Sequence, residues 1–456
     1  MALVAALESY LNGKGIEFEE ISHSCTDCLL DVGKELAIPL EQIVTAVMVA
    51  DGERLLMLAT PLNKLIDVDE LQQLLARELK SVPTAELTDL FPECVESCVP
   101  ALGLAFDVPM VIDERVAEME TLYIASGTAQ SLVRINNAHS AGLFEGAVVR
   151  AFCHVVGDQS DVSETVDANF ARRRIISLVE KTEGLPAMPD MAQRLLVVSS
   201  DPEAGANELA RVIELDPSLS AQVVSYARSA IYSYRGTIAT VRDAISRVLG
   251  FDLVANLGLG IALAKHFDLP HDGALGLNHF WRHAVYCGAL VEGLATTMPK
   301  EIRPRPGHPY LIGLLHNMGY LLLGYLYEPG YAKLNTYIEC NPHVPISDLE
   351  AYVLGVSHQE IAAQLLQFWQ MPQETIDATR WHHDLSYEGE NKQYVHLIAL
   401  ANRILRRYGI GDEASGDLPP ELFKHTGIDP ERAMKVVEVI LDKGEGLELL
   451  ANQLAA

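Results

Sequence analysis

The stretch Gly313-Leu314-Leu315-His316-Asn317-Met318-Gly319 decides how the second half of this chain is interpreted. An apolar, helix-like run delivers a histidine and then a side-chain amide, and a glycine follows. More histidines lie on either side in the sequence, at His283, His358 and the pair His382-His383. Neutral imidazoles from several helices can gather around a metal ion. The stretch therefore predicts a histidine cluster inside a bundle of helices.

The chain from about residue 172 onward has the apolar period of helices, and no strand pattern of any length interrupts it. Asp201-Pro202 and Asp216-Pro217 are typical helix starts, with the aspartate as N-cap and the proline in the first turn. We predict an all-α domain over residues 172–410. The tail over 411–456 begins with Gly411-Asp412-Glu413, and we expect it to form a helical cap on the bundle.

The chain before residue 155 mixes short strands with helices. Two apolar runs, 43–49 and 54–60, are separated by Asp51-Gly52, which is a hairpin signal. The pattern predicts an α+β domain with a mixed sheet over residues 1–155. The polar, acidic segment that follows, residues 156–171, has no apolar period and is predicted to be a linker.

The charge of the chain limits its partners. Of 456 residues, 62 are Asp or Glu and 34 are Lys or Arg, which gives a formal net charge of −28 spread along the chain. Affinity for nucleic acid comes largely from Lys and Arg contacts to phosphate, so this charge argues against non-specific nucleic-acid binding. It argues in the same way against anionic membranes.

Nothing in the sequence predicts export or a membrane span. The first eight residues lack the basic region of a secretory signal and have the pattern of an amphipathic helix. No apolar run reaches the about 18 residues that a membrane-spanning helix needs. We therefore expect a cytoplasmic protein with reduced cysteines. Cys25, Cys28, Cys94 and Cys98 could supply four thiolates to zinc, but their loose spacing favours ordinary cysteines.

Residues 1–155 resemble the YbaK/ProX family of aminoacyl-tRNA deacylase-associated domains. The resemblance rests on short motifs: Ser22-His23-Ser24, Ile43-Val44, Pro100-Ala101-Leu102-Gly103, Val111-Ile112-Asp113 and Ser126-Gly127. It implies a pocket formed by His23, Thr45, Gly103, Ser126 and Gly127. Active members carry a lysine directly after the Ile-Val pair, and here that position is Thr45. A threonine cannot supply a cation to stabilise an acyl-ester oxyanion, so the resemblance implies a degenerate deacylase pocket.

The charge of this region points the same way. Residues 1–155 contain nine Lys and Arg against 24 Asp and Glu, a formal charge of −15. A domain that handles tRNA should offer basic contacts to phosphate. We therefore expect that the domain has lost deacylase activity and keeps a pocket for a small molecule or a protein.

Residues 170–410 resemble the HDOD domain, a relative of HD-type phosphohydrolases found in bacterial signalling proteins. Many short motifs occur in the order of that family: Leu185-Pro186, Glu208-Leu209-Ala210, Asp216-Pro217, Ala244-Ile245, Leu249-Gly250, Phe280-Trp281, the stretch 313–319, His358-Gln359-Glu360-Ile361 and Trp381-His382-His383. The resemblance implies metal-ligand positions at His283 and His316, with additional ligands of two-metal variants at His358 and at His382 or His383. The aspartate positions of such a site are Asn317 and Asn402.

The amides weaken the case for metal. An amide oxygen is neutral and is a poorer metal ligand than a carboxylate. We therefore expect no resident cofactor, and the alternative is a divalent metal bound weakly by the remaining histidines. Without metal, the histidines would hydrogen-bond to one another and to Asn317 as a polar plug.

The paired departures, Thr45 in one pocket and Asn317 with Asn402 in the other, favour a non-catalytic protein. We predict a bacterial signalling or scaffold protein that binds protein partners, or a small-molecule or nucleotide ligand, through two degenerate enzyme folds. Two enzymatic alternatives stay open. They are aminoacyl-tRNA editing by residues 1–155 and residual metal-dependent phosphohydrolase activity in residues 172–410.

Overall fold

The structure is a computed structural model, and it describes residues 3–24, 28–52, 54–82, 84–95, 98–136, 142–156, 166–180, 185–228, 232, 234, 236–264, 267–305, 307–442 and 444–455. The chain forms two compact units. The strand-containing unit consists of Met1–Thr165, Lys333–Val353 and Ala414–Gly416. The helical unit consists of Val166–Ala332, Leu354–Glu413 and Asp417–Ala456. The chain therefore passes between the units five times.

The strand-containing unit is built around a five-stranded sheet with the order β5-β2-β3-β6-β9. Its strands are β2 (Val44–Asp51), β3 (Arg54–Pro61), β5 (Lys80–Ser81), β6 (Met110–Asp113) and β9 (Val148–Arg150). β2 and β3 form the predicted hairpin, in which Asp51 pairs with Arg54 and Gly52 has a φ of +65°. β6 pairs in parallel with both β3 and β9. The sheet is therefore mixed, as the sequence predicts.

A second sheet is antiparallel and has the order β1-β8-β7. Its strands are β1 (Phe18–Ser22), β7 (Thr121–Ala125) and β8 (Ser131–Asn136). A parallel bridge between Ile43 and Tyr123 joins it to the first sheet. Both sheets and α1 (Ala5–Gly13) contribute to one hydrophobic core, which includes Leu7, Leu11, Val44, Met57, Ile124 and Val133. The unit also contains α2 (Leu29–Glu35), η1 (Leu40–Gln42), α4 (Thr84–Leu90), η3 (Gly103–Phe106) and α5 (Glu114–Glu118).

The third sheet of this unit pairs β4 (Lys64–Ile66) with β10 (Cys153–Val155). Asn341, which is far away in the sequence, binds both backbone groups of Ile66: its Oδ1 accepts from the N–H at 2.7 Å and its Nδ2 donates to the carbonyl at 3.1 Å. Next to them, Asp67 is the N-cap of α3 (Val68–Leu75) and accepts from the hydroxyls of Tyr337 and Tyr352 at 2.8 and 2.6 Å. The segment 333–353 thus completes this part of the unit with side-chain hydrogen bonds.

The helical unit contains the remaining elements. They are α6 (Val166–Glu180), α7 (Asp190–Ser200), α8 (Ala206–Ile213), α9 (Pro217–Ala227), α10 (Val241–Ala244) with the π-turn η6 (Ile245–Leu249), α11 (Phe251–Ala264), α12 (Leu277–Thr297), α13 (His308–Leu315), α14 (Met318–Leu326), α17 (His358–Phe368), α18 (Gln373–Trp381), α19 (Lys392–Arg406), α20 (Pro420–Thr426), α21 (Pro430–Asp442) and α22 (Gly444–Ala455). α15 (Glu328–Cys340) begins in this unit and ends in the other, to which α16 (Ile346–Val353) belongs. The predicted linker over 156–171 falls mostly outside the described residues.

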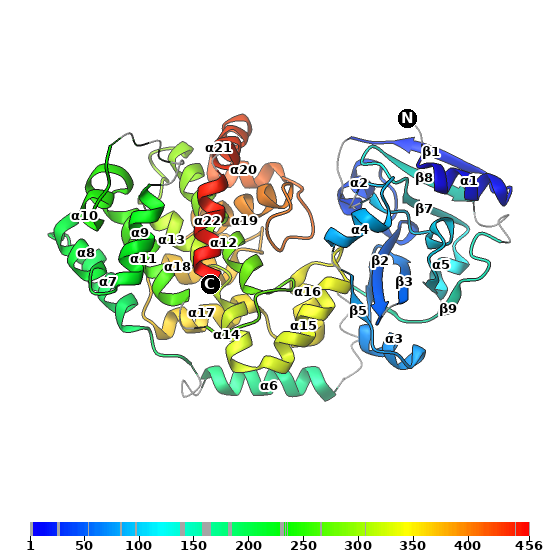
Figure 1. Cartoon of the computed structure of the whole chain (residues 1–456), viewed down its shortest axis with the longest axis horizontal. Helices are drawn as coiled ribbons and strands as arrows, with labels where there is room; N and C mark the ends of the chain where they lie inside the picture. Colours follow the sequence, from blue (N-terminus) through cyan, green and yellow to red (C-terminus); the bar gives the residue numbers. More distant parts are fainter. Residues whose placement is uncertain are drawn as a thin grey trace. The chain divides into compact units, whose positions relative to one another are not determined.

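Helix α12 is the centre of the helical unit. It is 21 residues long and buried over most of its length. α13, α19, α21 and α22 pack against it, and Figure 1 shows α22 running beside it. Long helices around a shared apolar core give the all-α architecture that the sequence predicts. In the part of the chain that the structure describes, no helix has both the length and the apolar character needed to cross a membrane.

Candidate functional site

The predicted histidines and amides come together inside the helical unit. Most lie at helix ends: His283 on α12, His316 at the end of α13, Asn317 at the start of α14, His358 at the start of α17, His382 and His383 after α18, and Asn402 on α19. All are buried except His383, which is half-buried. The centroids of neighbouring imidazole rings are 4.2 to 5.4 Å apart. We call these seven residues the histidine cluster.

A close approach of two helices brings His358 into the histidine cluster. Gly319 lies in the first turn of α14, and a Cβ at this position would lie 2.6 Å from the carbonyl carbon of His358. The obstacle is backbone, which cannot rotate away as a side chain can. The glycine that ends the opening motif is therefore required for packing between α14 and α17.

The backbone carbonyl of Gly313 fixes the tautomer of His316. A carbonyl oxygen can only accept, so the His316 Nδ1, which is 2.7 Å away, carries the proton. The Nε2 of the neutral ring then carries a lone pair, which accepts a hydrogen bond from the Nδ2 of Asn402 at 3.3 Å. This orients the amide of Asn402. Its Oδ1 accepts from the Nε2 of His283 at 3.1 Å and from the thiol of Cys287 at 3.2 Å.

The chain of donors and acceptors continues to Asn317. Because the Nε2 of His283 donates its N–H to Asn402, the Nδ1 of the neutral ring carries a lone pair. The Nδ2 of Asn317 donates to this Nδ1 at 3.3 Å and to the Oδ2 of Asp412 at 2.8 Å. Amide N–H groups thus occupy the lone pairs of His283 and His316, which a metal would otherwise use. An aspartate at either amide position would have no N–H to place there.

The other half of the histidine cluster is arranged differently. The Nδ1 of His382 donates to the carbonyl of Thr379 at 2.7 Å, and the Nδ1 of His383 lies 3.0 Å from the Oε1 of Glu413. The Nε2 of His382 faces the Nε2 of His358 at 3.3 Å. Metal-binding histidines commonly have one ring nitrogen held by a carbonyl or carboxylate while the other binds the ion. This half therefore has the hydrogen-bond support of a metal site.

The sequence analysis missed a carboxylate, Asp412, that enters the histidine cluster from the loop after α19. Its Oδ2 accepts from Asn317 and, at 3.3 Å, from the hydroxyl of Tyr320, and its Oδ1 lies 3.9 Å from the Nδ1 of His283. The loop can come this close because Gly411 has a φ of +103° and no Cβ, which would lie 2.9 Å from the His283 Nε2. Among 62 acidic residues, one beside a glycine gives no distinctive signal. The cluster thus consists of more than histidines and amides.

Burial determines the charge of these groups. Burial, together with the neighbouring His283, lowers the pKa of His316 to about 3. Burial and the adjacent His383 lower the pKa of His382. Burial raises the pKa of Asp412, but the facing imidazoles, His283 first, lower it by more, and the net pKa is below the ordinary value. At neutral pH an ionised carboxylate therefore lies among rings of which at least two are neutral.

The chemistry of the histidine cluster is compatible with a divalent metal. Two sets of side chains have donor atoms within 4.8 Å of one another: His283, Cys287 and His316 in one set, and His358, His382 and His383 in the other. Asn317 Oδ1 and Asp412 Oδ1 are buried acceptors with no hydrogen-bond donor among the described residues. A buried carboxylate oxygen without a donor is costly, and a cation would compensate it. The set of His358, His382 and His383 could therefore hold a metal, whereas in the other set amide N–H groups occupy the lone pairs of His283 and His316.

The neutral histidines make stability depend on pH. The unfolded chain binds a proton at His316 below its ordinary pKa of 6.5, whereas the folded protein does so only near 3. The contribution of neutral His316 to the free energy of unfolding is therefore fully present above pH 6.5. It decreases by about 1.4 kcal/mol per pH unit as the pH drops toward 3. We expect urea midpoints, followed by the tryptophan fluorescence of the helical unit, to decrease from pH 7 to pH 5. His316→Gln should reduce this slope and His271→Gln, an exposed control, should not. A slope that is flat in the wild-type protein would contradict the neutral cluster.

The candidate residues of the strand-containing unit lie at strand and turn ends. His23 follows β1, Thr45 is the second residue of β2, Gly103 begins η3, and Ser126 and Gly127 follow β7. The parallel bridge between Ile43 and Tyr123 sets two of these segments side by side and in the same direction. Thr45 and Ser126 both follow the bridge in the sequence, so they lie toward the same end of the two parallel segments. The side chain of Thr45 is 8 % exposed, and it offers a hydroxyl where the resemblance implies a cation.

Hydroxyl groups surround Ser126. Its Oγ lies 3.0 Å from the Oγ1 of Thr128 and 3.0 Å from the Oγ of Ser131, and Ser131 donates to Glu20 at 2.7 Å. The hydroxyls are thus engaged with one another and with a carboxylate. The cysteines considered as zinc ligands give no support for a thiolate site, since burial raises the pKa of Cys94 to about 11. Cys25 lies outside the described residues.

Comparison with known families finds two matches within the chain. Residues 185–385 match the HDOD domain, and residues 24–143 match the aminoacyl-tRNA editing domain. Both resemblances drawn from the sequence motifs are thereby confirmed, as is their fusion in one chain.

Solved structures and a curated relative add to this. The crystal structure of a protein from Marinobacter aquaeolei VT8, named a putative signal transduction protein, covers 100% of both chains with 28% identity and a TM-score of 0.83. An HDOD domain protein of unknown function from Geobacter sulfurreducens covers 62% of this chain and 98% of its own, with 21% identity and a TM-score of 0.51, and shares the fold. An uncharacterized protein of Treponema pallidum (strain Nichols) is 24% identical over 260 residues, 57% of this chain. The chain spans about half the length of that relative, 49%.

Proposed function

Residues 185–385 form an HDOD domain and residues 24–143 an aminoacyl-tRNA editing domain, and on this premise we propose that the chain is a signal-transduction scaffold that acts by binding and not by catalysis. The two domains and the Marinobacter structure fit a signalling or scaffold protein. The geometry of the two pockets supports a role without catalysis.

One observation carries the proposal: amide N–H groups point at the lone pairs inside the histidine cluster. Asn402 donates to His316 and Asn317 donates to His283, so two imidazoles are engaged by hydrogen bonds. Catalysis of the HD type depends on a metal that lowers the pKa of a bound water. A metal at this half of the cluster would have to displace both amides, which contribute no charge in return.

The strand-containing unit supports the same conclusion. Thr45 is buried, and a hydroxyl there cannot replace the charge of an ammonium group in stabilising an oxyanion. The formal charge of −15 over residues 1–155 would repel the phosphates of tRNA. We propose that both pockets serve recognition, with protein partners of a signalling pathway, or a small-molecule or nucleotide ligand, as their targets.

A second candidate function, metal-dependent phosphohydrolase activity, is favoured by Asp412. Its Oδ1 is a buried acceptor without a donor among the described residues, and the Nε2 of His382 faces the Nε2 of His358, not an amide of the described residues. The half of the cluster with His358, His382 and His383 would hold the metal. Asp412, which interacts electrostatically with His383 and His358, would be the nearby charge. A bound metal there would supply an activated water for phosphodiester hydrolysis.

Assays on the purified full-length protein separate these functions. We expect no hydrolysis of bis(p-nitrophenyl) phosphate with Mn²⁺, Fe²⁺ or Zn²⁺, and no deacylation of a mischarged aminoacyl-tRNA, above the levels of His316→Ala and Ser126→Ala variants. Phosphodiester turnover, with stoichiometric metal that His382→Ala removes and Asn402→Ala retains, would establish the second candidate instead. Deacylation that Ser126→Ala abolishes would restore the editing function. A partner captured by pull-down and then purified should bind the wild type and the exposed control His271→Gln equally, and a partner of the cluster pocket should bind the His316→Ala variant more weakly.

A further inference from the structure

A pocket of about 510 Å³ opens in the helical unit between α9, α11, α12, α13, α21 and α22, and none of the cluster histidines lines it. This volume is within the range of small-molecule sites, about 300–1,000 Å³. Most of its lining is apolar and includes Leu253, Val436, Ile440 and Leu447. The pocket can therefore receive an apolar body. The few polar groups in the pocket determine which functional group a ligand must carry.

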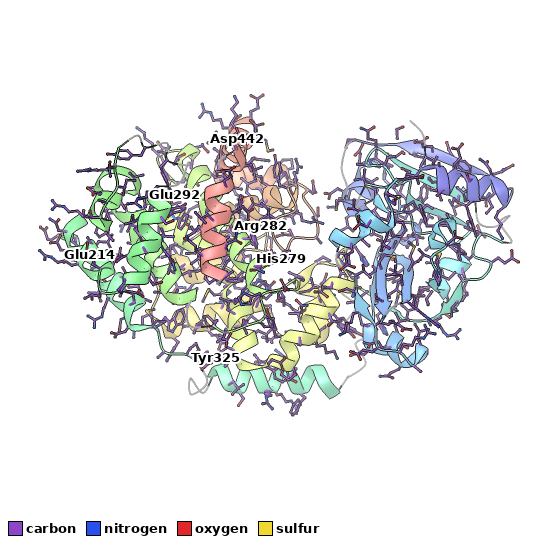
Figure 2. All side chains as sticks on the ribbon, in the orientation of Figure 1. Glu214, His279, Arg282, Glu292, Tyr325 and Asp442 are labelled. Atoms are coloured by element: carbon purple, nitrogen blue, oxygen red, sulfur yellow. The ribbon has the colours of Figure 1, made fainter. Side chains whose placement is uncertain are left out.

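The carboxylate of Glu292 is the main charge in the pocket. It projects from α12 (Figure 2 labels it) and accepts from the N–H of Gly307 at 3.1 and 3.2 Å and from the N–H of Tyr310 at 3.3 Å. Burial raises its pKa, and the negative charge of Asp252 acts in the same direction. Among the described residues, no Lys, Arg or His lies within ion-pair distance of it. A partly buried negative charge is thus left without a cation.

Three tyrosines line the same pocket. The rings of Tyr226 and Tyr232 meet edge to face with centroids 5.5 Å apart, and Tyr310 adds a third ring. The Tyr310 hydroxyl is buried and interacts with the hydroxyl of Tyr226. Burial raises the pKa of all three, so they are neutral phenols at pH 7. Aromatic faces attract cations, with a gain of about 0.5–2 kcal/mol per contact that grows as water is excluded.

We propose that this pocket binds an organic ammonium ion, a primary or quaternary amine attached to an apolar body. The apolar walls take the body, and the tyrosine rings with Glu292 take the cationic head. An anion of the same size would be repelled by Glu292 and by the nearby Asp252. A neutral molecule would leave the charge of Glu292 without a counter-ion. Lys435 also lines the pocket, but it is exposed on α21 and forms no ion pair with Glu292 among the described contacts.

Three probes with the same tail and different heads test the charge preference. Octyltrimethylammonium, 1-octanol and octanoate, each below its micellar concentration, are titrated into the full-length protein by calorimetry at pH 7.5. We expect the ammonium to bind at least about tenfold more tightly than the other two, which corresponds to about 1.4 kcal/mol. Equal or tighter binding of octanoate or octanol, or no binding of any probe, would overturn the proposal.

Matched variants locate the binding. Glu292→Gln keeps an acceptor for the Gly307 and Tyr310 N–H groups but removes the charge, so it should cut the ammonium affinity about tenfold and leave that of octanol unchanged. Glu438→Gln, an exposed carboxylate on α21 that does not line the pocket, should have no effect. Ala289→Phe should fill the pocket and abolish binding of every probe. If the ammonium binds Glu292→Gln or Ala289→Phe as tightly as the wild type, the assignment is wrong. Failure here leaves the scaffold proposal untouched, because no cluster residue is involved.

Discussion

Replacing Asn317 and Asn402 together by aspartate should give the protein at least one more equivalent of tightly bound divalent metal than the wild type holds. Each substitution removes an N–H that occupies an imidazole lone pair and adds a negative charge beside His283 and His316. We expect affinity for Zn²⁺ or Mn²⁺ to rise on the order of 100-fold, the upper range of what supporting groups contribute to metal sites. Elemental analysis after dialysis and calorimetric titration measure the change.

The stability of that double variant provides an independent check. Without metal, the new carboxylates join Asp412 in a buried site with no cation, so the melting temperature should fall. Added metal should raise it again, because a ligand that binds only the folded state stabilises it. An aspartate at the exposed position Asn207 controls for added charge and should change neither metal content nor melting temperature. A folded double variant with the metal content of the wild type would refute the explanation from the amides.

Gly319→Ala should destabilise the helical unit by about 3 kcal/mol, the upper end of typical overpacking. The new methyl group would lie 2.6 Å from the carbonyl carbon of His358, and neither backbone can yield without separating α14 from α17. Urea unfolding followed by tryptophan fluorescence isolates this effect, because Trp281, Trp369 and Trp381 all belong to the helical unit.

Gly205→Ala is the matched control for this measurement. Its new methyl group would meet only the Oε2 of Glu208, at 3.5 Å, so it should cost less than about 1 kcal/mol. If Gly319→Ala unfolds at the same urea concentration as the wild type, the packing role assigned to Gly319 is incorrect. The two glycines differ in what surrounds them, which the sequence alone does not reveal.

The sequence predicts which residues gather in the histidine cluster but not the contacts that govern its chemistry. His283, His316 and His358 could be foreseen because their motifs occur in a known order. The roles of the two amides follow from tautomers set by the carbonyl of Gly313, and that contact exists only in the folded chain. Asp412 could not be foreseen, because its place depends on how a loop turns at a glycine after the last helix of the cluster.

The fold shows a similar division. The hairpin at Asp51-Gly52 was predictable, since turn chemistry and two apolar runs specify it locally. The strands β4, β9 and β10 have three residues each, too few to show an alternating pattern, and were not predicted. Their pairing depends on tertiary contacts, and for β4 these include Asn341, which is more than 270 residues away.

The hydrogen bonds of Asn341 to Ile66 also have a consequence for the order of synthesis. The 167 residues from 166 to 332 must be made before the segment 333–353 reaches the strand-containing unit. At about 5–20 residues per second, the ribosome needs on the order of 10–30 s for them. During this interval the backbone groups of Ile66 form part of an open strand edge, which is where non-native pairing begins. The strand-containing unit is therefore completed only after most of the helical unit has been synthesised, and until then the strand edge at Ile66 is open to other strands.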